Sequence, residues 1–114
     1  MAELDVKERQ AGDVTILDLT GAVRIGEGSI ALRNAIRGLV DGNKNKILLN
    51  LAGVKYMDSS GIGELIANYT TVSRKGQLKL LNLTDKIQDL LVITKLLTVF
   101  DTFDSESEAL NSFQ

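Results

Sequence analysis

The feature that most constrains the fold is a nearly continuous apolar run, Ile47-Leu48-Leu49-Asn50-Leu51. The run is too short for a buried helix, and it lacks the strict alternation of a strand with one face in water. A run of this kind is typical of a strand that is covered on both faces in a parallel sheet. We therefore predict that residues 47–51 form the central strand of such a sheet.

Segments with helical spacing alternate with strand-length segments along the rest of the chain. Helices are predicted over residues 30–40, with Arg33 and Arg37 turned away from the core, and over residues 62–72. Thr84 is the expected N-cap of a third helix that carries Ile87, Leu90 and Leu91 inward. Ser105 and Glu108 have the spacing of a capping box, which predicts a fourth helix. The other predicted strands are an opening hairpin turning at Gly12-Asp13 and the runs 78–83 and 99–103.

The order β, β, α, β, α, β, α, β, α implies right-handed crossovers, with antiparallel pairing only in the opening hairpin. We predict an α/β fold with a mostly parallel mixed β-sheet of about 4–5 strands packed with about 4 helices. The chain has no proline, repeat or low-complexity block, so residues 1–114 are expected to form a single domain.

Composition argues against several kinds of chemistry. The chain has no cysteine or histidine, so we expect no disulfide, no metal site, no cofactor and no enzyme activity. Thirteen Lys and Arg residues are scattered among 15 Asp and Glu residues, which argues against binding to nucleic acid. We see no secretory signal and no run near the ~18 apolar residues of a membrane span. A cytoplasmic protein without a membrane partner, either a monomer or a weak dimer, is the expectation.

The segment Val54 to Gly63 lies between the central strand and the best-defined helix, where sites are usually built in open α/β sheets. The first turn of a helix has unpaired N–H groups and a partial positive charge, which favour an anion. A serine here would present its hydroxyl at the surface, and Gly61 and Gly63 would leave room for the active site of another protein. Asp, Ser and Gly are also ordinary N-cap residues, so structural capping remains open beside modification.

The sequence Tyr56-Met57-Asp58-Ser59-Ser60-Gly61-Ile62-Gly63 resembles the D-S-[ST]-G-[LIV]-G signature of the STAS family, which bacterial anti-sigma factor antagonists typify. The resemblance implies that the unmodified chain binds an anti-sigma serine kinase and so frees a sigma factor. Phosphorylation of Ser59, with Ser60 as a lesser alternative, would break that complex, and a serine phosphatase would restore it. The resemblance also implies a partner-binding surface made of Tyr56, Met57, Asp58, Ser59, Ser60, Gly61, Ile62, Gly63 and Arg24, in which Asp58 helps to present Ser59.

Several alternatives remain open at the level of sequence. Arg24 stands where many family members carry aspartate, so the choice of kinase is open. Tyr56 and Met57 suit either partner contact or the core. The chain would also suit a non-catalytic scaffold subunit of a stress-sensing or transporter-associated assembly. Gly26-Glu27-Gly28 lacks a known phosphate-loop pattern, and a hydrolase built on Asp58 and Ser59 lacks an activating base.

Overall fold

The computed structural model describes residues 3–113, and its first two strands form the predicted hairpin. Strand β1 (Leu4–Ala11) pairs antiparallel with β2 (Val14–Val23), and the two are joined at Gly12 and Asp13. Gly12 adopts a φ of 62°, which the turn needs and which glycine reaches without strain.

Three parallel strands complete the sheet: β3 (Lys46–Met57), β4 (Gln77–Leu81) and β5 (Thr102–Phe103). The strand order is β1-β2-β3-β4-β5, so the predicted central strand does lie in the middle. Ile47, Leu48 and Leu49 are fully buried, as expected of a strand covered on both faces. With five strands and four helices within residues 3–113, the structure confirms the predicted fold class.

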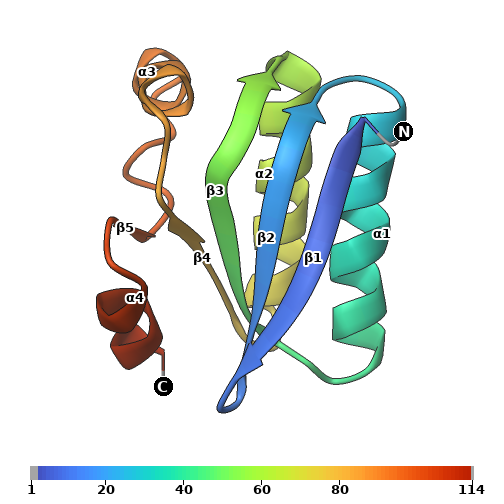
Figure 1. Ribbon diagram of the computed structural model, residues 1–114, viewed down its shortest axis with the longest axis vertical. Coiled ribbons are helices and arrows are strands. Elements are labelled where there is room, and N and C mark those ends of the chain that lie inside the picture. Colours follow the sequence, from blue (N-terminus) through green and yellow to red (C-terminus); the bar gives the residue numbers. More distant parts are fainter. Residues whose placement is uncertain (1–2, 114) are drawn as a thin grey trace.

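The helices divide between the two faces of the sheet (Figure 1). Helices α1 (Glu27–Asp41) and α2 (Ser59–Ser73) cover one face, and α3 (Asp85–Ile93) adds Ile87 and Leu91 to the same large core. Helix α4 (Glu106–Ser112) covers a smaller core on the other face. The predicted caps are confirmed: Thr84 accepts a hydrogen bond from the N–H of Ile87 at 3.3 Å, and Ser105 accepts one from Glu108 at 3.4 Å.

Strand β3 is longer than the apolar run predicted, because it continues beside β2 as far as Met57. Residues 54–57, which were expected to connect strand and helix, therefore belong to the strand. The apolar pattern of β3 is interrupted at Ala52 and Gly53. The pairing with β2 nevertheless continues, with two shifts of register, one between Asp18 and Thr20 and one between Gly21 and Ala22.

Strands β4 and β5 are shorter than predicted. Strand β4 ends at Leu81, because Asn82 turns into the left-handed region with a φ of 57°. Strand β5 keeps only residues 102 and 103 of the predicted run, since it pairs only with Leu80 and Leu81. Phe100 instead packs its ring edge-on against Tyr69, with the ring centroids 5.0 Å apart.

The two edges of the sheet differ. Strand β1 forms the first edge, and four of its residues are exposed and polar: Asp5, Lys7, Glu8 and Gln10. Strand β5 forms the other edge and is only two residues long.

The predicted site is built at one end of the sheet. The carboxyl ends of β2 and β3 lie beside the amino ends of α1 and α2, at the top of Figure 1, and α3 lies at the same end. The short connections after β2 and β3 therefore meet there, which brings residues 24–26 next to residue 58.

Candidate functional site

Ser59 is the first residue of α2, and its side chain is exposed. It follows the end of β3 with only Asp58 between strand and helix. Asp58 is extended (φ −104°, ψ −173°), so the helix cannot begin before Ser59. The hydroxyl of Ser59 therefore lies at a helical first turn, where N–H groups have no partner within the helix.

The carboxylate of Asp58 joins the two connections at this end of the sheet. Its Oδ1 accepts a hydrogen bond from the N–H of Gly61 at 2.9 Å, which caps α2. Its Oδ2 accepts one from the N–H of Ile25 at 3.2 Å, in the connection between β2 and α1. The backbone N–H of Asp58 also donates to the carbonyl of Val23 at 3.4 Å.

These bonds keep Asp58 ionised. The pKa of its carboxyl group lies below the ordinary value, chiefly because the N–H of Gly61 stabilises the charged form, with smaller contributions from Ile25 and Ser60. Both oxygens are thus occupied by backbone donors, so Asp58 positions Ser59 through the backbone.

The two glycines that follow Ser60 have different roles. Gly61 is buried, and a Cβ there would overlap the carbonyl oxygen of Val23 and the side chain of Met57. The expectation that Gly61 leaves room for a partner is therefore corrected: its missing side chain lets α2 approach β2. Gly63 is exposed, and a Cβ there would meet nothing within 4 Å.

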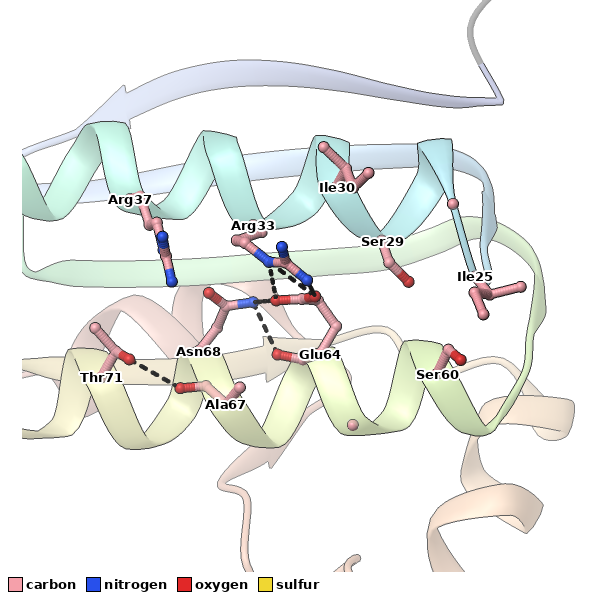
Figure 2. Close-up of a pocket in the computed structure, with 12 residues that line it drawn as sticks. Ile25, Ser29, Ile30, Arg33, Arg37, Ser60, Glu64, Ala67, Asn68 and Thr71 are labelled. Atoms are coloured by element: carbon pink, nitrogen blue, oxygen red, sulfur yellow. Dashed lines mark hydrogen bonds and ion pairs between the residues drawn. The ribbon is translucent and has the colours of Figure 1, made fainter.

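Ser60 is half-buried and lines a groove of about 600 Å³ between α1 and α2 (Figure 2). Exposed Ile25 and Ile30 border the groove at the end near Ser60, and Arg37 borders it farther along α1. Ser59 and Ser60 therefore differ, because Ser59 is exposed at the tip of the helix and Ser60 is half-buried.

Arg33 has a definite partner in this groove. Its guanidinium donates to Oε1 of Glu64 at 2.8 Å, and Glu64 is only 7% exposed. Asn68 donates to the other oxygen of Glu64 at 3.0 Å, as the dashed lines in Figure 2 show. Arg33 was predicted only to turn away from the core, and the structure adds that its ion pair with Glu64 ties α1 to α2.

Arg24 and Tyr56 lie together beside the connection that Asp58 holds. Nε of Arg24 donates to Oε1 of Glu3 at 2.8 Å, and the Arg24 Cζ lies 5.6 Å from the centroid of the Tyr56 ring. A guanidinium at this distance over an aromatic ring is attracted to it. Tyr56 is 49% exposed, so its ring can contact another molecule.

Met57 and Ile62 are core residues, with 8% and 6% of their surfaces exposed. Together with buried Gly61 they support the segment from the core, so of the two alternatives left open for Met57 the structure favours the core. Their place in a partner-binding surface stays a prediction. Sequence reasoning missed Ile25 and Ile93, each 76% exposed. Ile93 and Tyr56 line one groove of about 310 Å³ between β3 and α3. An isolated isoleucine among glycines was the available signal for Ile25, whereas nothing in the helical pattern singled out Ile93.

Comparison with known proteins identifies the family. Residues 5–109 match the STAS domain family, so the chain belongs to that family. An anti-sigma F factor antagonist from Paenibacillus polymyxa is 28% identical over 69 residues. That match covers 60% of this chain and 59% of the relative, so the chain spans less than two thirds of that protein's length.

Solved structures show the same fold. A Thermotoga maritima protein superposes with a TM-score of 0.87 at 24% identity, over 95% of this chain and 93% of that one. The Bacillus cell fate determinant SpoIIAA in its phosphorylated form gives 0.72 at 18% identity, over 94% and 97%. A sulfate transporter family protein from Wolinella succinogenes gives 0.70 at 18%, over 89% and 84%. Within residues 3–113, no helix is long and apolar enough to cross a membrane.

The contrast between the two glycines gives a first prediction. Gly61→Ala should destabilise the protein by about 1–3 kcal/mol, because the added methyl group meets the Val23 carbonyl. Gly63→Ala should stabilise it by about 0.5–1 kcal/mol, since alanine is the better helix former and the space is open. Urea unfolding of both variants measures the two changes. Equal effects would contradict the close packing at Gly61.

The hydrogen bonds of Asp58 give a second prediction. Asp58→Ala should lower Tm because it removes the cap, whereas Asp58→Asn keeps one capping oxygen but loses the charge and the acceptor that faces the N–H of Ile25. Because the folded-state pKa of Asp58 is depressed, the charge stabilises the fold above the unfolded-state pKa of about 3.9. That stability is lost as pH falls through the folded-state pKa. The Tm difference between wild type and Asp58→Asn should therefore be larger at neutral pH than in strong acid, and a difference that does not change with pH would contradict a role for the charge.

Proposed function

We propose that this chain is a non-catalytic anti-sigma factor antagonist that is switched by phosphorylation of Ser59. The unmodified form binds an anti-sigma serine kinase and releases a sigma factor, and the phosphorylated form does not bind. The observation that carries the proposal is the exposed Ser59 at the first position of α2, in a chain of the STAS family. The name of the Paenibacillus relative and the phosphorylated form of SpoIIAA support it.

The surface around Ser59 has the character of a protein interface. We call it the switch surface and define it by five exposed residues from four parts of the chain: Arg24, Ile25, Tyr56, Ser59 and Ile93. Ile25 is tied to Asp58, and Tyr56 and Ile93 share a groove with Met57. Exposed apolar side chains with an arginine among them are typical of the centre of an interface.

Phosphorylation would weaken docking on this surface through charge. A phosphoserine carries about −1.5 to −2 charge at neutral pH, and a partner that covers it must remove its water. An unfavourable change of roughly 3 kcal/mol lowers affinity about a hundredfold. The hydrogen bonds that shape the segment come from Asp58 and the backbone, so the fold should survive modification of an exposed hydroxyl.

The geometry of Asp58 supports the proposal that this chain is a kinase substrate and a binding protein, and argues against a hydrolase. A hydrolase that uses Ser59 as nucleophile needs a base to take the hydroxyl proton. Both oxygens of Asp58 already accept backbone hydrogen bonds, and its lowered pKa makes it a weak base. The chain has no histidine to replace it.

The proposal predicts modification at one position. Incubation of the full chain with ATP and each candidate anti-sigma kinase encoded in the same genome should add a single phosphate, which mass spectrometry should locate at Ser59. Ser59→Ala should abolish the modification, and Ser60→Ala should retain it because Ser60 faces the groove between α1 and α2. Ser59→Asp should keep a cooperative thermal unfolding transition while binding that kinase at least about tenfold more weakly. Phosphate on Ser60 alone, or none with any kinase, would overturn the proposal.

The switch surface predicts which apolar residues matter for docking. Ile93→Asp should weaken binding of the unmodified protein to the same kinase at least about tenfold, because an interface anchor contributes on the order of 2 kcal/mol. Val99→Asp is the matched control, since Val99 is also exposed but lies in the turn before β5. Isothermal titration calorimetry measures both affinities. Equal weakening by the two variants would place the interface elsewhere.

A scaffold role in a larger assembly is the second candidate, and the fold shared with the Wolinella sulfate transporter family protein favours it. Stable self-association in analytical ultracentrifugation, together with the absence of phosphorylation, would select this role.

A further inference from the structure

The backbone of Arg24 is held directly opposite the residue that precedes Ser59. The peptide groups on either side of Arg24 both bond to Asp58: the carbonyl of Val23 accepts from the Asp58 N–H, and the N–H of Ile25 donates to the Asp58 carboxylate. The carbonyl of Arg24 itself accepts from the backbone and the hydroxyl of Ser29 in α1. The long side chain of Arg24 therefore starts from a fixed point beside the amino end of α2.

The guanidinium of Arg24 has unused hydrogen-bond capacity. An arginine has five N–H donors, and among the described residues only the Nε of Arg24 has a partner, Glu3. The side chain is 53% exposed, and its second contact is the face of Tyr56. Neither contact is strong at an exposed site, because water screens the ion pair and competes with the ring.

The other charged groups at this end of the molecule are less suited to receive a phosphate on Ser59. Glu27 and Asp58 carry carboxylates, which repel a phosphate. Glu27 accepts a hydrogen bond from the N–H of Glu3, and the Asp58 carboxylate accepts from backbone N–H groups. Lys55, Lys86 and Asp89 line the groove on the side of α3. Lysine offers a point charge, whereas the planar guanidinium of arginine binds phosphate oxygens in pairs.

We propose that Arg24 binds the phosphate of phosphorylated Ser59, and that it leaves Glu3 and the face of Tyr56 to do so. The inference rests on the proposed function, because it presupposes modification of Ser59. Modification then changes the switch surface in two further ways: the carboxylate of Glu3 loses its cation, and the Tyr56 ring loses the guanidinium that covers it. The kinase is thus released by a rearranged surface as well as by the charge of the phosphate.

The test needs no kinase, because phosphoserine can be incorporated at position 59 of the full chain during translation. A bound guanidinium favours the dianion, so ³¹P NMR should give a second phosphate pKa below the usual value of about 6. Arg24→Gln should raise that pKa by at least about half a unit, and molar salt should reduce the difference. The ring protons of Tyr56 should shift on phosphorylation in the wild-type background but not in Arg24→Gln.

Two variants complete the design. Lys55→Gln is the matched control, because it removes one positive charge from the neighbouring strand end and should leave the phosphate pKa nearly unchanged. Arg24→Lys keeps the charge but cannot bind two oxygens in a plane, so it should give an intermediate pKa. An unchanged pKa in Arg24→Gln, or an equal change in Lys55→Gln, would overturn the inference. Failure of every kinase to modify Ser59 would instead overturn the proposed function while these ³¹P measurements stood.

Discussion

The carboxylate of Asp58 holds together the parts on which the site depends. One oxygen fixes where α2 begins, and the other fixes the connection between β2 and α1. Ser59 and Arg24 come from segments far apart in the sequence, and this carboxylate relates their positions. The role of Asp58 beside the serine can therefore be understood from the backbone: peptide N–H groups stabilise its charge, and its carboxylate in turn fixes the position of those peptide groups.

The parts that could be predicted from the sequence depend on local physical signals. The apolar run at residues 47–51 reports burial on two faces, and it lies at the centre of the sheet. The caps at Thr84 and Ser105 involve atoms three residues apart, so spacing alone locates them. The start of α2 after Asp58 follows from the same local rule, which is why Ser59 could be placed at a helix tip.

The parts that could not be predicted depend on contacts between distant segments. Strand β3 continues to Met57 only because β2 runs beside it, and β5 is short because it reaches only the end of β4. The pairing of Arg33 with Glu64 joins two helices, and neither residue has a distinctive sequence context. Ile93 ends a helix whose other isoleucine, Ile87, is buried, so its exposure depends on how α3 lies against β3.

The unlike edges of the sheet affect how the protein can associate. An uncovered strand edge offers unpaired peptide groups to which a neighbouring chain can add a strand. Here β5 is too short to act as such a template. An incoming strand at β1 would have to remove water from the polar side chains along that strand. Recruitment by strand addition is thus disfavoured at both edges. Under the proposed function, a partner would instead recognise side chains at the carboxyl ends of the strands, where a phosphate on Ser59 would decide whether the two proteins associate.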